Sequence, residues 1–382
     1  MHVAILRASR PGAMHRTAMP STQHQREFDM NPFLSEASYP RARVSLSVAV
    51  LSVLAASSAL AKGDEGGGWK PRVQQLEAQV AALQLKGLPI EAAVDCGSGG
   101  SIQQTLEANA EGTGLLTITV TGTCSETVRI KRSNVVLRGQ GAAAIQAPAG
   151  ALFIVNVDDN VNNVTISDLT IAGSSTAAVL AQKGAHAVLK NAIVQQAGAG
   201  VMALDNGVLD VTGSTIRTNN NGAYAARGGV VSISNSTLEN NSVGVLTWKA
   251  GAVNLTSSLP DYAEASVGPI VRNNTTGVVV RSGGFVELAD TTIQGNQNGI
   301  VVDSGGAAHF FSQLNGTGNR VTGNVMGVLA SKNASLVFSD NTNAITANVR
   351  GIVCSANSSY IVPPNFSGAS GNQQGDVVGC IP

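Results

Sequence analysis

Three short stretches decide the fold: IRTNNNGA at residues 216–223, LENNSVGV at 238–245 and IQGNQNGI at 293–300. Each contains an aliphatic residue, an asparagine three positions later and a glycine three positions after that. The glycines Gly200, Gly222 and Gly244 are 22 residues apart, and the same local pattern recurs as far as Gly351. Self-similarity at a fixed period of this size is the signature of a repeat protein.

Aligned on these glycines, the repeats form columns of similar residues. Three positions before the glycines stand Asn219, Asn241, Asn274, Asn296, Asn324 and Asn348. Six positions before them stand Val194, Ile216, Leu238, Val271, Ile293, Val321 and Ile345. A second strand follows in each repeat, with pairs such as Leu209/Val211, Val231/Ile233, Val253/Leu255 and Val286/Leu288. Alternating apolar residues in short runs predict strands with one buried face.

These columns predict an all-β, single-stranded, right-handed parallel β-helix of about ten coils between residues 115 and 355. Stacked asparagine amides bond to one another, and asparagine tolerates the left-handed backbone of a sharp bend. A leucine-rich repeat would need a leucine-dominated consensus with helices, and a propeller would need a period of about 40 residues. Neither feature is present.

Composition agrees with this fold and excludes one class of partner. Charged residues make up 13% of the 382-residue chain, aromatic residues 4%, and there are 43 glycines. The formal charge is zero. A nucleic-acid-binding protein needs a basic face toward the phosphates, so we expect no nucleic-acid partner.

The N-terminal region predicts export. Arg41 and Arg43 precede an apolar run over residues 44–54, and Ala59-Leu60-Ala61 fits a small-x-small cleavage site. This run is short for a membrane span, so we expect none after signal removal. The predicted divisions are an extension with a signal peptide (1–61), a linker with a short helix (62–93) and the β-helix domain (94–382). The predicted location is secreted, periplasmic or at the cell surface.

The four cysteines form two close pairs at the ends of the predicted body. The spacings of 28 and 26 residues do not suit a zinc site. In an oxidising compartment we expect the disulfides Cys96–Cys124 and Cys354–Cys380.

Two helices are predicted before the first clear strand. Val73, Leu76, Val80 and Leu83 form an a/d seam within residues 69–84. This amphipathic segment either pairs chains as a short coiled coil or lies on the body. Ser101, followed by Ile102-Gln103-Gln104, predicts an N-cap for a short helix that ends near Asn109.

The beginning of the body resembles a known group. The segments 94–96, 101–109, 121–126 and 134–139 are similar to the opening of secreted bacterial right-handed β-helix proteins of the pectin-lyase-like superfamily. That group includes lyases, hydrolases, epimerases and non-catalytic binding proteins, so the resemblance implies the fold and leaves the activity open.

Catalytic residues are not identifiable from the sequence. Arg129-Ile130-Lys131 resembles a polygalacturonase tripeptide but lies in the first coils, away from any acidic cluster. His186 and His309 have no acid nearby in their own coils, and Asp158-Asp159 is interpreted as a solvated turn. We therefore expect no metal ion and no cofactor.

Two groups of outward residues are candidates for binding. Trp248, Arg281 and Asp303 stand four positions after successive glycines and predict a row that suits a sugar. The alternative is a cross-coil Arg281–Asp303 ion pair beside a packed tryptophan. Two long coils carry insertions over residues 257–268 and 313–320 at one corner. The residues proposed to line a groove there are Asp261, Tyr262, Glu264, Arg272 and Arg320.

A third pattern concerns assembly. Two positions after the glycines stand Met202, Tyr224, Leu246, Val279, Val301, Leu329 and Val353. An exposed apolar stripe of this kind is typical of a contact surface and predicts a homo-oligomer. The sequence as a whole favours a non-catalytic exported protein that binds glycans or forms a structural rod. The alternative is a lyase, hydrolase or epimerase acting on uronic-acid polymers.

Overall fold

The computed structural model describes residues 69–257, 268–312, 317–355 and 357–380. The chain divides into two units, 1–77 and 78–382, and the described part of the first unit is the helical segment 69–77. Helix α2 (Trp69–Lys86) confirms the predicted helix, while its pairing with another chain stays a prediction. None of the described helices is long and apolar enough to cross a membrane.

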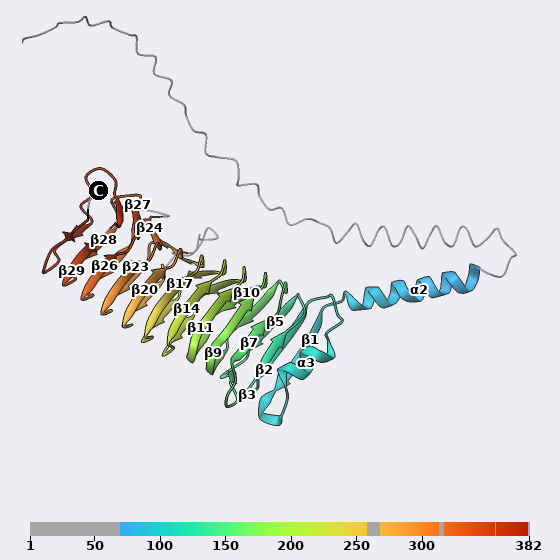
Figure 1. The fold of residues 1–382 in the computed structure, drawn as a ribbon. Helices are drawn as coiled ribbons and strands as arrows, with labels where there is room; N and C mark the ends of the chain where they lie inside the picture. Colours follow the sequence, from blue (N-terminus) through green and yellow to red (C-terminus); the bar gives the residue numbers. More distant parts are fainter. Residues whose placement is uncertain (1–68, 258–267, 313–316, 356, 381–382) are drawn as a thin grey trace, which may run out of the picture. The chain divides into compact units, whose positions relative to one another are not determined.

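The second unit is a parallel β-solenoid (Figure 1). From β2 onward, each coil contributes to three sheets that follow one another along the chain. Sheet 1 contains β1 (Ile90–Asp95), β2 (Leu116–Thr121), β5 (Val135–Gly139), β8 (Val164–Ser167), β10 (His186–Lys190), β12 (Val208–Thr212), β15 (Val230–Ser234), β18 (Ala252–Leu255), β21 (Phe285–Ala289), β24 (Ala307–Phe311), β27 (Ser335–Phe338) and β30 (Ser359–Ile361).

Sheets 2 and 3 lie on either side of the asparagine bend. Sheet 2 contains β3 (Thr123–Ser125), β6 (Ala144–Gln146), β13 (Thr215–Arg217), β16 (Thr237–Glu239), β19 (Ile270–Arg272), β22 (Thr292–Gln294), β25 (Arg320–Thr322), β28 (Ala344–Thr346) and β31 (Ala369–Ser370). Sheet 3 contains β4 (Val128–Ile130), β7 (Phe153–Val157), β14 (Asn221–Ala226), β17 (Val243–Trp248), β20 (Thr276–Arg281), β23 (Asn298–Asp303), β26 (Met326–Ala330), β29 (Arg350–Cys354) and β32 (Val377–Val378). β9 (Thr170–Gln182) and β11 (Ile193–Leu204) run through the bend and join both sheets.

The predicted β-helix is confirmed, and it is longer than predicted. Sheet 1 has 12 strands, of which ten lie in the predicted range. The two additional strands are β1 at the start and β30 at the end. The aliphatic columns on both sides of the bend are fully buried and form one continuous core.

The asparagine column forms a continuous hydrogen-bonded ladder inside the solenoid. Each Asn Nδ2 donates to the Oδ1 of the next asparagine at 3.0–3.1 Å, from Asn219 through Asn348. Each Nδ2 also donates to a backbone carbonyl, as Asn274 does to Leu238 at 3.1 Å. From Asn241 onward, each Oδ1 accepts a second bond from the backbone N–H of the preceding asparagine, as Asn296 does from Asn274, and Asn219 Oδ1 accepts from the Ala197 N–H. These buried amides are therefore fully satisfied.

Two details of the ladder differ from the prediction. The left-handed residue of the bend is the one before the ladder asparagine, at positions such as Thr218, Asn240 and Asn273, because the ladder residue itself must point inward. The ladder also continues one coil further to Asn372, whose Nδ2 donates to Asp376 at 2.8 Å.

A second polar ladder, not predicted, lies at the corner between sheets 1 and 2. Ser236 Oγ accepts from the backbone N–H of Ser214, and Asn319 Nδ2 donates to Asn343 Oδ1 at 2.7 Å. Its buried members are Ser214, Ser236, Thr291, Asn319 and Asn343. The residue type changes along this column, so sequence periodicity did not reveal it.

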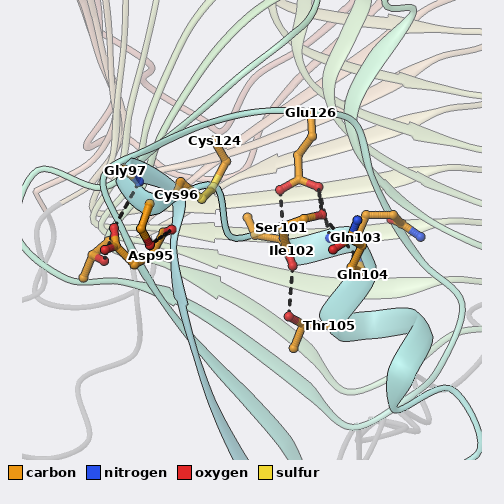
Figure 2. The surroundings of a disulfide bond; sticks show 12 residues. Asp95, Cys96, Gly97, Ser101, Ile102, Gln103, Gln104, Thr105, Cys124 and Glu126 are labelled. Carbon is orange, nitrogen blue, oxygen red and sulfur yellow. Dashed lines mark hydrogen bonds between the residues drawn. A yellow bond between two sulfur atoms is a disulfide. The ribbon is translucent and has the colours of Figure 1, made fainter.

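The N-terminal end is closed by helix α3 (Ile102–Ala108) and the predicted Cys96–Cys124 disulfide, which is confirmed (Figure 2). Ser101 caps α3 by accepting from the backbone N–H of Gln104, as predicted. Glu126, from the next coil, accepts from the backbone N–H groups of Ile102 and Gln103 and from the Ser101 hydroxyl. A carboxylate at the positive end of a helix stabilises it.

The C-terminal end is closed by the confirmed Cys354–Cys380 disulfide and a stack of aromatic rings. Phe310 and Phe338 stack with their ring centroids 4.2 Å apart, and Tyr360 meets Phe338 edge-on. Burial raises the pKa of Tyr360 to about 12. These large rings fill the interior of the last coils of sheet 1, from β24 to β30.

The apolar stripe lies on the outer face of sheet 3. In the strand register it begins at Leu180 and ends at Val378. Its members stack on one another, so Leu180, Met202 and Val279 are buried and the others up to Val353 are partly buried. A homo-oligomer through this stripe stays a prediction.

The ladder yields a stability prediction with a matched control. Asn296→Ala leaves buried donors and acceptors of two neighbouring coils without partners, and we expect a loss of about 3 kcal/mol in the free energy of unfolding. Gln297→Ala, the exposed neighbour, should change it by less than about 0.5 kcal/mol. Denaturant unfolding measures both, and equal effects would contradict the role of the ladder.

The end of the ladder yields a pH prediction. The backbone and side-chain N–H groups of Asn372 hold the pKa of Asp376 below its ordinary value of 3.8. A lowered folded pKa stabilises the fold above the unfolded pKa, and this contribution disappears as the pH falls through the folded value. Below pH 3.8, the wild type should therefore lose more thermal stability than Asp376→Asn, which keeps an acceptor without a titratable charge. If the melting temperatures of the two proteins change with pH in parallel, the stabilising role of the Asp376 carboxylate is refuted.

Candidate functional site

The outer face of sheet 1 carries a straight column of polar side chains. The register aligns Asp210, Ser232, Asn254, Glu287 and His309 on the consecutive strands β12, β15, β18, β21 and β24. Their strand neighbours on both sides, such as Val286 and Leu288 beside Glu287, point into the core. At about 4.8 Å per strand, the column is about 19 Å long.

The positions of these five residues in the repeat could have revealed the column from the sequence. Its members stand ten residues after Gly200, Gly222, Gly244, Gly277 and Gly299. Each lies between the two apolar residues of the second strand, which is the outward position of a strand with one buried face. We missed the column because its residue types differ, whereas the buried columns repeat theirs.

Aromatic rings flank the polar column. Phe285, two residues before Glu287, is 37% exposed. Phe311 lies on the other side of the column and stacks with the His309 ring at a centroid distance of 5.2 Å. An exposed phenyl ring beside hydrogen-bonding groups combines an apolar contact with polar recognition.

Both histidines contact an acid from an adjacent coil. His186 Nε2 lies 2.8 Å from Asp210 Oδ2. His309 Nδ1 lies 3.6 Å from Glu287 Oε1, and its Nε2 lies 2.6 Å from Ser339 Oγ. The sequence predicted no acid near either histidine in its own coil. In the folded protein, stacking of the coils places an acid of the neighbouring coil beside each histidine. The four side chains are 31–42% exposed, so solvent or a ligand reaches them.

The predicted row Trp248–Arg281–Asp303 lies at the end of the sheet 3 strands, one turn before sheet 1. Arg281 and Asp303 are in register. Within the described residues no ion pair joins them, so the alternative interpretation as a cross-coil ion pair is wrong. Lys249 Nζ instead lies 4.1 Å from the centroid of the Trp248 ring. The row therefore borders the edge of sheet 1 at which its strands begin.

The bases of the two insertions lie at the opposite edge, where the sheet 1 strands end. Asp290 connects them: its Oδ2 accepts from Ser257 Oγ at 3.0 Å, and its Oδ1 accepts from Thr317 Oγ1 at 2.9 Å and from the Gly318 N–H at 3.1 Å. Asp261, Tyr262 and Glu264 lie outside the described residues. Their role in binding stays a prediction.

The two candidate arginines lie on sheet 2. Arg272 Nη2 lies 2.7 Å from Glu239 Oε2 across neighbouring strands. Arg320 is exposed at the start of β25 and lies in a different outward column from Arg272. The structure thus does not bring Arg272 and Arg320 together with the row of Trp248, and their role in binding stays a prediction.

A small cavity of about 50 Å³ lies between α3 and β4. Arg129 and Arg132 line this cavity, but both side chains already bond to other groups of the protein. Arg129 Nε donates to both oxygens of Asp158, at 2.8 and 2.9 Å. The buried Arg132 donates to the carbonyls of Asn109 and Gly114, and burial lowers its pKa. Arg132 therefore caps the C-terminal end of α3 through the Asn109 carbonyl, and this structural role argues against a ligand in the cavity.

No described group suits a metal ion. Cys96, Cys124 and Glu126 lie close together, but the sulfurs are joined in a disulfide and Glu126 caps α3. Asp158 and Asp159 are each paired with a cation, Arg129 and Lys183. Among the described groups, the outer face of sheet 1 combines hydrogen-bonding side chains with exposed aromatic rings, and we take it as the candidate site.

Comparison with known proteins defines the class. The model of the right-handed β-helix region matches residues 117–259 and 153–343. These matches span more than half of the chain, and the protein belongs to the right-handed β-helix family. Among solved structures, it is similar to the A-module of the mannuronan C-5 epimerase AlgE6 of Azotobacter vinelandii, with 15% identity and a TM-score of 0.41. That comparison covers 74% of this chain and 94% of the module. No curated protein matches the sequence.

Asp290 provides a test of the insertion corner. Asp290→Ala removes the acceptor shared by Ser257, Ser312, Thr317 and Gly318. We expect the Gly318 amide to exchange its hydrogen about tenfold faster, because one charge-assisted bond is lost. Asp303→Ala, at the opposite edge of sheet 1, is the control. Unchanged exchange at Gly318 would show that Asp290 does not hold the corner.

Proposed function

We propose that this chain is an exported, non-catalytic protein that binds glycans on the outer face of sheet 1. The column Asp210–Ser232–Asn254–Glu287–His309 carries this proposal. Carboxylate, hydroxyl, amide and imidazole groups are the hydrogen-bonding partners that sugar hydroxyls need. The flanking Phe285 offers an apolar surface for the face of a sugar ring.

The solenoid supports binding of an extended chain. Successive coils repeat the same outward position at about 4.8 Å, a spacing comparable to one sugar unit of an extended polysaccharide. The column belongs to strands whose neighbouring residues are buried, so the polar groups need little ordering when the ligand binds. A rigid linear array of this kind suits a polymer better than a small molecule.

Two observations support the remaining parts of the proposal. The two disulfides suit a protein that matures in an oxidising compartment, which agrees with the signal-like segment before residue 62. The carboxylates of the column, Asp210 and Glu287, are three strands apart, or about 14 Å. Hydrolysis of a glycosidic bond needs a carboxylate pair within about 10 Å, so this column favours binding over hydrolysis.

Binding is tested with a glycan panel and matched variants. Asn254→Ala removes two hydrogen-bonding groups from the centre of the column, and we expect about fivefold to tenfold weaker binding of the best glycan in titration calorimetry. Asn298→Ala is the control, because Asn298 is a half-buried outward asparagine on sheet 3. Equal affinities of the two variants would refute the placement on sheet 1.

The bordering row is tested separately. If the Trp248 ring extends the same surface, Trp248→Ala should weaken binding by about tenfold, because the apolar face of a sugar ring would lose its contact with the indole ring. Full affinity in this variant would remove the row from the binding surface and leave the column in place.

His309, held between Glu287 and Ser339, favours the catalytic alternative, a lyase, hydrolase or epimerase acting on uronic-acid polymers. A histidine beside a carboxylate is suited to move a proton. Incubation with uronic-acid polymers, with and without Ca²⁺, would then give new reducing ends, unsaturated products or epimerised residues. Turnover that disappears in His309→Gln would replace the non-catalytic proposal.

A further inference from the structure

We infer that the polymer bound on sheet 1 is uncharged, and that Asp210 and Glu287 exclude polyuronates from this face. The inference rests on the proposed function. It specifies which class of polymer the site binds. Neither membership of the family nor the polarity of the column specifies that class.

The charge of the face carries the argument. The five strands β12, β15, β18, β21 and β24 contain two carboxylates and no lysine or arginine. The charged or titratable groups on their outer face are Asp210, Glu287 and His309, with His186 of β10 beside Asp210. A surface built to hold a row of uronate carboxylates needs cations, and arginine is the residue that pairs with carboxylates best.

The nearest cations lie at the border of the column. Lys249 lies over the Trp248 ring, and Arg281 is in register with Asp303 at the start of the turn into sheet 1. Lys190 lies on β10, one strand before Asp210. None of them lies within the column, so a polyuronate along the five strands would meet Asp210 and Glu287 with no lysine or arginine in the column and only His186 and His309 beside these carboxylates.

Distance makes this repulsion effective. A polymer that follows the column places its groups within hydrogen-bonding distance of Asp210 and Glu287. Salt at physiological strength screens charges only beyond about 8 Å. A neutral sugar instead presents hydroxyl donors, which the two carboxylates accept in charge-assisted bonds. The same two side chains therefore attract one class of polymer and reject the other.

The test compares two polymer classes on the full chain without its signal segment. Titration calorimetry measures binding of neutral polymers (xyloglucan, glucomannan and mixed-linkage glucan) and of polygalacturonate and alginate at low and high salt. We expect the wild type to bind at least one neutral polymer about tenfold more tightly than either polyuronate. High salt should raise the affinity for the polyuronates, because it screens the repulsion.

Charge-removing variants identify the groups responsible. Asp210→Asn combined with Glu287→Gln keeps the side-chain shapes and should reduce the discrimination to about threefold or less. Glu287→Gln alone should reduce it partly. Glu107→Gln is the matched control, because Glu107 is an exposed glutamate on α3, has no ion pair with any described residue and makes the same charge change away from the face. It should leave the discrimination unchanged.

The failures of the two proposals are distinguishable. Polyuronate binding by the wild type that equals or exceeds neutral-polymer binding overturns this inference and leaves glycan binding in place. Discrimination that persists in the double variant also overturns it, because the carboxylates would then not be its cause. If no polymer of either class binds, the proposed function falls and the inference falls with it.

Discussion

The hydrogen bonds between stacked asparagine amides are the interaction on which the rest of this fold depends. A bend that turns inward must bury backbone and side-chain polar groups, and each unpaired group costs about 1–3 kcal/mol. The ladder pairs every one of them with the coil before or after. Because the ladder residue occurs once per coil, it also fixes which residue of one coil faces which residue of the next.

That fixed register positions the candidate site. A one-residue slip would turn every outward side chain into the core. With the register held at the bend, Asp210, Ser232, Asn254, Glu287 and His309 form a column although they lie 22 or 33 residues apart along the chain. The insertion after β18 leaves the column intact, because its extra residues leave and re-enter the solenoid at one corner that Asp290 holds.

The sequence predicted the features that repeat, since repetition is how they were recognised. The core columns, six ladder asparagines, the capped helix at Ser101 and both disulfides follow from spacing and residue type. Asn372 was missed although Gly375 stands three positions later, because Ala369 takes the place of the larger aliphatic residue and Asp376 follows the glycine where the other coils have an apolar residue. The Ser214 ladder and the Asp210 column were missed because different residue types occupy equivalent positions. The contacts of His186 and His309 depend on side-chain conformation across coils, which spacing along one chain does not specify.

The ladder also has a polarity. From Asn219 to Asn372, every side-chain amide points one N–H toward the C-terminal end of the solenoid, while its second N–H donates to a backbone carbonyl of the preceding coil. Aligned amide dipoles add along an axis, as peptide dipoles do in an α-helix, and leave a partial positive charge at the end toward which the N–H groups point. Asp376 occupies that end and receives the last N–H. The column of amides thus behaves as a macrodipole outside any helix, and the terminal carboxylate neutralises its positive pole.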